Sequence, residues 1–320
     1  MINSIAKLKR HRDYLFLTLA ALVISTAALL IKGAQSEGAT SSAIAFLRLG
    51  IASACLILLS FKSIYSDVKR CGTGTILRSA LAGIFLALHF LVWTKSLEYI
   101  SVSKSTFLVT TSPIWVAMIG FLVLKETITR QQIIGIMIAM VSALLILHLE
   151  DEIFTNRDAI SLKGEMLATL GAISIAAYLI LGRSLRRTIR LASYVFLTCG
   201  FATVTLALYH LHNEESLIPD LSTTAWFYIL CLALGPQLIG HTILNWGVRR
   251  FHATIVSMTV LAEPILASLL AWTILNEVIR LNNLIGFAGM LLGIFIVIHN
   301  KPPSVFISNK LKHDMNESHE

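Results

Sequence analysis

Glu263 is the first candidate for chemistry in this chain, because it is a carboxylate inside a long apolar segment and is followed by Pro264. Ionisable side chains are costly in hydrocarbon, so they usually face a bundle interior or a water-filled cavity. Proline removes one backbone hydrogen bond and bends a helix. A carboxylate at such a bend can bind a cationic group or carry a coupling proton. The alternative is a structural ion pair, or bonding to the freed backbone groups.

A stripe of polar residues follows Gly235 and Pro236 in another apolar segment. Gln237, His241 and Asn245 are spaced by four residues, which places them along one face of a helix. This pattern predicts the lining of a cavity, with hydrogen bonding between helices as the alternative. His241 is the strongest of the three, because histidine can change its protonation state near neutral pH.

Histidine and aromatic residues recur in mid-segment. His89 and Trp93 are four residues apart and therefore share a face, and Tyr178 and Trp272 are two further aromatic residues in apolar segments. An aromatic wall suits organic molecules, particularly cations or flat rings. The alternative is packing or anchoring at the membrane interface. Packing is the more common role, and Trp93 and Tyr178 are stronger candidates for contact with a ligand than Trp272.

Three other ionisable residues call for a structural interpretation first. Arg48 lies about eight residues into an apolar segment, where it can bind a carboxylate ligand, extend its head to the surface or pair with Glu263. We favour a structural role for Arg48. Glu126 and Glu277 lie at the ends of apolar segments. Their placement predicts helix-end bonding or the closing of a gate.

The composition requires that these residues lie in a membrane protein. Of 320 residues, 56% are hydrophobic and 14% are charged, against roughly 25% charged in soluble domains. This excludes a soluble enzyme and a disordered chain. The apolar runs are long and continuous and suit helical spans of about 20 residues, whereas membrane barrels show short alternating segments. The fold class is therefore an all-α polytopic membrane protein.

The apolar runs predict ten transmembrane helices. Their expected ranges are 14–31, 41–61, 76–97, 102–124, 131–149, 163–182, 191–210, 223–248, 251–275 and 281–299. The expected organisation is a basic N-terminus (1–13), a first repeat (14–149), an external acidic linker (150–162), a second repeat (163–299) and a polar tail (300–320).

The distribution of positive charge predicts the orientation. With the N-terminus in the cytoplasm, inside segments hold 19 of the 26 Lys and Arg residues, outside segments hold 6, and Arg48 lies within a span. Positive residues favour the cytoplasmic side. We therefore expect a multi-pass protein of the inner cell membrane with both termini in the cytoplasm. The basic runs suit contact with anionic lipid and do not indicate nucleic acid.

The chain repeats itself at a shift of 151 residues. The segment "PIWVAMIGFLVLKETITRQQIIG" aligns with "PILASLLAWTILNEVIRLNNLIG". Two five-helix halves follow, and because five is odd, the second half is inverted around a central cavity. The shift takes His89 to position 240, so one inserted residue would match it to His241. The coinciding residues are Lys32 with Arg183, Pro113 with Pro264, Glu126 with Glu277 and Gly135 with Gly286.

Several motifs resemble the EamA-type branch of the drug/metabolite transporter superfamily over about residues 14–299. They are "AFLRLG" around Arg48, "HFLVWTKSLEYISVSKSTFLVTTSPIWVAM" with "KE", and "GHTILNWGVRRFHATIVSMTVLAEPILASLLAW" with "NE". The resemblance implies a ten-helix fold with a central cavity, alternating access and no ATPase domain. It suggests a secondary transporter that exports amino acids or related compounds, with proton coupling as an option.

Other functions stay open at this level. An importer or exchanger, for example of a nucleoside-containing cofactor, is the alternative within the same class, and a non-transporting scaffold is a further one. The sequence contains no HExxH, GxSxG or P-loop pattern that would indicate an enzyme. Neither a cofactor nor a metal site is expected, because the four cysteines show no ligand spacing. Gly289 and Gly293 form a GxxxG pair that serves either packing inside the bundle or a homodimer.

Overall fold

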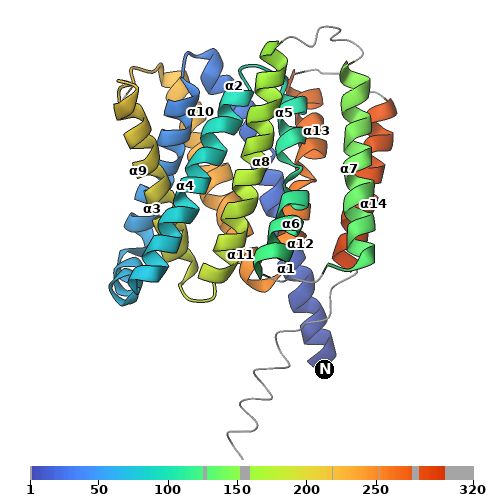
Figure 1. The fold of residues 1–320 in the computed structure, drawn as a ribbon, viewed down its shortest axis with the longest axis horizontal. Helices are drawn as coiled ribbons and strands as arrows, with labels where there is room; N and C mark the ends of the chain where they lie inside the picture. The colour runs from blue at the N-terminus through green and yellow to red at the C-terminus, as the bar shows by residue number, and fades with distance from the viewer. Residues whose placement is uncertain are drawn as a thin grey trace, which may run out of the picture.

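The computed structural model describes residues 2–124, 128–151, 159–217, 219–251, 253–275 and 281–299, and all regular structure in these ranges is helical. The helices run side by side in one bundle (Figure 1). In the first half they are α1 (Ile2–Ile24), α2 (Ala27–Ser36), α3 (Ser41–Arg70), α4 (Thr73–Ser96), α5 (Val102–Val109), α6 (Ser112–Leu124) and α7 (Arg130–Asp151). In the second half they are α8 (Ala159–Leu185), α9 (Leu191–His212), α10 (Thr223–Leu232), the π-helix η1 (Ala233–His241), α11 (Thr242–Arg250), α12 (Ala253–Val260), α13 (Glu263–Leu275) and α14 (Leu281–His299).

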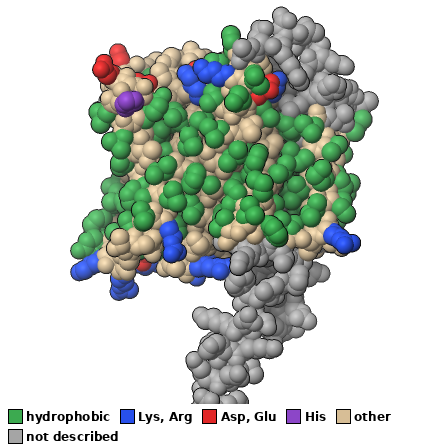
Figure 2. All heavy atoms as spheres, in the orientation of Figure 1, with side chains coloured by type: hydrophobic (Ala, Val, Ile, Leu, Met, Phe, Trp, Pro, Cys, Tyr) green, Lys and Arg blue, Asp and Glu red, His purple; other side chains and the backbone are tan. Residues whose placement is uncertain are grey.

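The outer surface of the bundle is apolar along its middle. Figure 2 shows hydrophobic side chains over the central band of one face, with charged side chains gathered toward the two ends. Within the described ranges, seven segments are long and apolar enough to cross a membrane, and two shorter apolar helices accompany them. The protein is therefore a multi-pass integral membrane protein. The seven segments are Arg12–Ser36, Ser41–Arg70, Thr73–Ser96, Lys104–Val123, Ile160–Leu185, Leu191–His212 and Thr223–Arg250.

Short polar side chains start three of the helices. The side chains of Thr40, Ser101 and Ser222 accept hydrogen bonds from the amides three residues ahead, at 3.0–3.2 Å. These caps satisfy amides that the first helical turn leaves free. Between α2 and α3 the chain turns at Gly38, whose φ of +85° is a conformation that favours glycine.

The first predicted helix, 14–31, is wrong in two respects. Helical structure begins at Ile2, and the chain breaks at Ser25–Thr26 before α2 continues to Ser36. The hydroxyls of Ser25 and Thr26 donate to the carbonyls of Leu22 and Val23, at 2.7 and 2.8 Å. Local hydrogen bonding by hydroxyls competes with the helical ladder, which apolar periodicity alone does not show. The second helix is also longer than the predicted range 41–61, since α3 extends to Arg70.

Two predicted helices, 102–124 and 251–275, are each broken rather than only bent. The first half breaks between α5 and α6, and the second half breaks between α12 and α13. A proline ring clashes with the carbonyl four residues earlier. Counting back four from Pro113 and Pro264 gives Val109 and Val260, and these are the last residues of α5 and α12. Both prolines then occupy the first turn of the next helix, where a missing N–H costs nothing.

The predicted helix at 223–248 contains a π-helical stretch that the sequence analysis did not anticipate. α10 passes into η1 around Pro236, and α11 continues to Arg250. A π-helix bonds each amide to the carbonyl five residues earlier, so a π-helical turn accommodates one extra residue within an α-helix. Its counterpart in the first half, α4, is α-helical from Thr73 to Ser96. The second half therefore gains one residue at this place.

Glycines bring the last helices of the two halves together. A Cβ atom on Gly293 would lie 2.4 Å from the carbonyl oxygen of Gly135, and one on Gly289 would meet the side chain of Ser142. The pair at Gly289 and Gly293 therefore packs α14 against α7 inside the bundle, as Figure 1 also shows. This face does not provide a homodimer interface, and association of two copies stays a prediction.

Candidate central site

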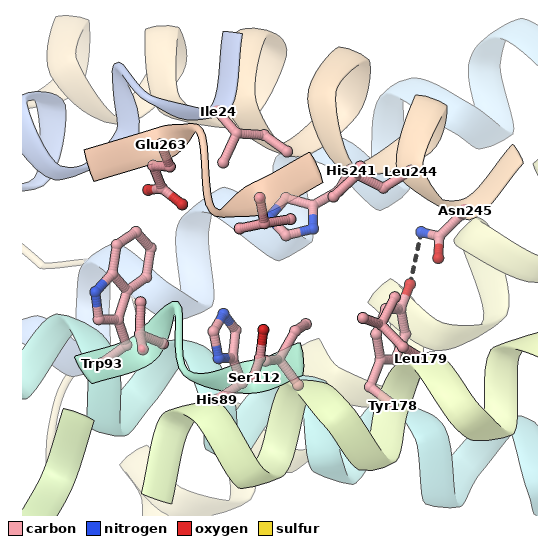
Figure 3. A pocket seen from close by; sticks show the side chains of 13 residues that line it. Ile24, His89, Trp93, Ser112, Tyr178, Leu179, His241, Leu244, Asn245 and Glu263 are labelled. Atoms are coloured by element: carbon pink, nitrogen blue, oxygen red, sulfur yellow. Dashed lines mark hydrogen bonds between the residues drawn. The ribbon is translucent and has the colours of Figure 1, made fainter. Parts of the chain in front are cut away.

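A cavity lies between the helices of the two halves. About 530 Å³ of space not filled by protein atoms, including space open to solvent, lies here, and side chains from both halves line it. Figure 3 shows Glu263, His241 and Asn245 on one side of this space and Trp93, His89, Ser112 and Tyr178 on the other.

Most of the lining consists of matched residues. Among the described residues, 13 line the cavity, and ten of these form five pairs separated by one repeat length. Residues that occupy equivalent places in two halves therefore meet at one space. Three pairs are 151 positions apart, namely Ile24 with Ile175, Val109 with Val260 and Ser112 with Glu263, and two pairs are 152 apart, namely His89 with His241 and Trp93 with Asn245.

The breaks in the helices place the Ser112–Glu263 pair. Ser112 begins α6 and Glu263 begins α13, so each is the first residue after its break. Both are buried, at 2% and 3% exposure. The start of a helix favours a negative charge, because its free amides carry a partial positive charge. Oε1 of Glu263 is buried and has no hydrogen-bond partner among the described residues.

The two histidines reach the cavity in different settings. Nδ1 of His89 lies 2.9 Å from the carbonyl oxygen of Gly171, which can only accept, so Nδ1 carries the proton. The ring of His89 stacks on Trp93 with centroids 5.8 Å apart. His241 has its ring edge against Phe90, with centroids 5.2 Å apart. One residue added at η1 brings His241 into register with His89, as the single-insertion hypothesis requires.

Tyr178 and Asn245 join the two sides of the cavity at one end. Nδ2 of Asn245 donates to the hydroxyl of Tyr178 at 2.7 Å (Figure 3). Oδ1 of Asn245 is buried without a partner among the described residues. Behind this pair, the guanidinium of Arg186 donates to the backbone carbonyls of Asn245 and Ile189. Burial lowers the pKa of Arg186 to about 10, so this residue stays charged at neutral pH.

Two of the predicted residues lie near the cavity without lining it. Gln237 is buried and points Nε2 at Sγ of Cys199, 3.6 Å away. Arg48 is fully buried, so its head does not extend to the surface, and it forms no ion pair with Glu263. Its guanidinium carbon lies 3.8 Å from the centroid of the Phe90 ring, and its three nitrogens lack hydrogen-bond partners in the described part of the chain.

The structure thus brings six of the predicted residues to one cavity. These are Glu263, His241, Asn245, His89, Trp93 and Tyr178. Pro113 and Pro264 shape it by breaking their helices. Glu126 and Glu277 lie outside the described residues, and Trp272 is 53% exposed on the outer surface.

Ser112 and Phe90 were not predicted from the sequence. Ser112 could have been found by applying the shift of 151 to Glu263, since the two positions then coincide. Phe90 carries no such signal, because an aromatic residue in an apolar helix is most often packing. Only the packed structure places its ring between Arg48 and the two histidines.

Comparisons with known proteins agree with this architecture. The sequence model of the EamA-like transporter family matches twice, at residues 12–148 and 162–299. The chain is 24% identical over 266 residues to the uncharacterized transporter YetK of Bacillus subtilis, covering 81% of this chain and 79% of YetK. It is 25% identical over 267 residues to an uncharacterized transporter of Archaeoglobus fulgidus, covering 81% and 89%. A protein of known crystal structure shares the fold, with a TM-score of 0.71 and 16% identity, over 89% of this chain and 97% of that one.

Proposed function

Because this chain belongs to the EamA-like transporter family, we propose that it is a secondary transporter that carries a small organic metabolite through its central cavity. The observation that carries this proposal is the matched lining. Helices broken at corresponding places in two halves are typical of the substrate site of a secondary transporter. Here the breaks before Pro113 and Pro264 deliver Ser112 and Glu263 to one space.

The proposed architecture is ten membrane helices in two inverted repeats, 14–149 and 163–299. A matched contact supports the inversion. Lys32 donates to the carbonyl of Leu97 at the end of α4, and Arg183 donates to that of Phe251 at the end of α11. Figure 1 has these helix ends at opposite ends of the bundle. Two inverted halves that rock against each other would open the cavity to each side in turn.

Glu263 is the proposed coupling residue, because a single carboxylate can hold either a proton or a cationic group. The titratable side chains that face it across the cavity are His89, His241 and Tyr178. The charge of Arg48, whose guanidinium packs on the ring of Phe90, also acts on it. The cavity-facing residues contributed by its neighbours α1, α5 and α12 are apolar. Exchange of a proton for cargo at one carboxylate suits export driven by an inward proton gradient.

We place the protein in the inner cell membrane with both termini in the cytoplasm, where the positive charges favour them. The proposed cargo is an amino acid or a related compound, and the proposed direction is outward. Cargo and direction come from the family resemblance, and the bundle itself supplies the cavity and the one carboxylate among its described lining residues.

The test is transport into proteoliposomes that contain the purified full chain. A pooled panel of isotope-labelled metabolites is offered with and without a pH gradient, to wild type and to Glu263→Gln. The matched control is Glu165→Gln, which removes a carboxylate on α8 that pairs with Lys104 at 2.7 Å and does not line the cavity.

We expect wild type and the control to accumulate one class of metabolite in response to the gradient, and Glu263→Gln to lose this response. Transport that ignores both the gradient and the substitution would remove Glu263 from the mechanism and favour exchange or facilitated diffusion. A correctly folded wild-type protein that transports nothing from a broad panel would contradict the proposal and favour a scaffold.

A further inference from the structure

The hydrogen-bonding groups free to bind a ligand in the cavity are mainly acceptors. Oε1 of Glu263 and Oδ1 of Asn245 are buried acceptors without partners among the described residues, and against them stands one buried donor of the lining, Nε1 of Trp93, which also lacks a partner there. His89 uses its Nδ1 proton on the carbonyl of Gly171, so in the neutral ring Nε2 is an acceptor too. A buried acceptor without a partner is costly. These atoms therefore call for a ligand that brings N–H or O–H donors.

The charge of the cavity has one sign. Glu263 is the only carboxylate, and no Lys or Arg appears, among the described residues that line it. Two buried cations lie nearby, and neither is among the described residues that line the cavity. The guanidinium of Arg186 bonds to the backbone carbonyls of Ile189 and Asn245, and that of Arg48 packs on the ring of Phe90, 3.8 Å from its centroid. A ligand carboxylate would find no cation in the cavity and would be repelled by Glu263.

The positions of the acceptors set the shape of the ligand. Figure 3 shows Glu263 above the indole of Trp93 at one end of the cavity and Asn245 with Tyr178 at the other. A cation between Glu263 and Trp93 would gain from the carboxylate and from the aromatic face. Between these ends the walls are apolar, with Val109, Ile175 and Val260 among them.

From this arrangement we infer that the cargo is an organic monoamine with a flat or apolar body and a hydroxyl or N–H donor at its far end. Its ammonium group binds Glu263 beside Trp93, and its distal donor binds Oδ1 of Asn245. This inference rests on the proposed transport function, and it replaces the amino acid of that proposal with a related amine that lacks a carboxylate.

A matched series of small molecules tests the inference on the unaltered protein. The probes are tyramine, phenethylamine, tyrosine, the neutral alcohol 2-(4-hydroxyphenyl)ethanol and the anion 3-(4-hydroxyphenyl)propionate. Binding to the purified full chain is measured by isothermal titration calorimetry. We expect tyramine to bind most tightly, phenethylamine a few-fold more weakly, and tyrosine, the alcohol and the anion about tenfold more weakly or worse, because each lacks the ammonium or adds an unpaired carboxylate.

Three variants test which group of the ligand binds at each end of the cavity. Glu263→Gln should weaken tyramine by about tenfold or more, and Glu165→Gln should leave it unchanged. Asn245→Leu should remove the advantage of tyramine over phenethylamine. If a variant does not fold, the binding of the ligand series to the wild-type protein still tests the inference.

Two results would overturn the inference. One is tyrosine or the propionate binding as tightly as tyramine, which would indicate that Arg48 binds the carboxylate of the ligand. The other is tyramine binding that survives Glu263→Gln in a folded protein. If proteoliposomes transport some other metabolite of the panel and tyramine does not bind, the inference fails while the proposed function stands. If nothing is transported, the proposed function fails as well.

Discussion

The two halves of the bundle share a scaffold and differ in the chemistry they bring to the cavity. Each half breaks one helix four residues before a proline, at Val109 and at Val260, and each break delivers its next side chains to the same space. The delivered side chains are unlike. The first half presents Ser112 where the second half presents Glu263.

A second difference lies in the third span of each half. In the first half α4 brings His89 and Trp93 to the cavity, and in the second half η1 and α11 bring His241 and Asn245. The repeated backbone therefore fixes where the cavity lies, and the substitutions between halves fix what it can bind. A single carboxylate opposite an aromatic side chain is a product of that divergence.

Making the halves alike should have the largest effect. In Glu263→Ser both halves present serine, and we expect transport to fall by roughly ten- to a hundredfold, since bonds to charged groups contribute about 1.5–3 kcal/mol. Adding Ser112→Glu should restore part of it, because the matched position faces the same cavity. Transport is measured in proteoliposomes with Ser112→Ala as the control. Full activity in Glu263→Ser would show that the difference between Ser112 and Glu263 has no role in transport.

Removing the extra residue of η1 is the next largest change. Deleting Leu234, which is 43% exposed on the outer surface, should close η1 into an α-helix and change the local placement of Gln237 and His241, which lie within the π-helical stretch. We expect transport to drop at least about tenfold, because small misplacements of binding groups are costly. Leu234→Ala keeps the register and should transport normally. A deletion variant that transports as well as Leu234→Ala would show that the π-helix has no part in placing the site.

The contact between α7 and α14, the last helices of the two halves, should affect stability more than transport. In Gly293→Ala the added Cβ would lie 2.4 Å from the carbonyl of Gly135, and overpacking of this kind costs about 1–3 kcal/mol. The same change at Gly74, where nothing lies within 4 Å, should be neutral or slightly stabilising, because alanine is the better helix former. Thermal unfolding in detergent compares the two. Equal melting temperatures would contradict close packing of α7 on α14.

The smallest effect is expected from the single bond across the end of the cavity. Tyr178→Phe removes the acceptor for Asn245, and hydrogen bonds between membrane helices average about 0.6 kcal/mol. We predict a slight fall in thermal stability and a modest change in affinity for cargo. Ser142→Ala, at a hydroxyl that bonds to the backbone of its own helix, gives a matched control for loss of one hydroxyl. A loss of stability several times larger would mean that this bond holds the halves together.

Much of this architecture could be predicted from the sequence, because the bilayer imposes it. Long apolar runs predict helices, and the shift of 151 predicts two similar halves. The same shift, with one inserted residue, anticipates that His89 and His241 face one cavity. Pro264 predicts a bend, and the structure shows a complete break, with α12 ending at Val260 and α13 beginning at Glu263.

The contacts that depend on packing could not be predicted in this way. The position of Phe90 between Arg48 and the histidines, the bond of Asn245 to Tyr178 and the turn of Gln237 toward Cys199 all join residues far apart in the chain. Helical periodicity shows which residues share a face and does not show what that face meets. Apolar periodicity also cannot distinguish a π-helix from an α-helix over one turn, so η1 was missed.

The central claim is that one cavity between the two halves opens to each side of the membrane in turn. It is tested most directly at Ser112, replaced by cysteine in a chain whose native cysteines (Cys55, Cys71, Cys199 and Cys231) are alanine. A membrane-impermeant thiol reagent is applied to vesicles of either orientation, with and without cargo. We predict labelling from both sides, with cargo lowering the rate. Labelling from one side only, unchanged by cargo, would contradict alternating access.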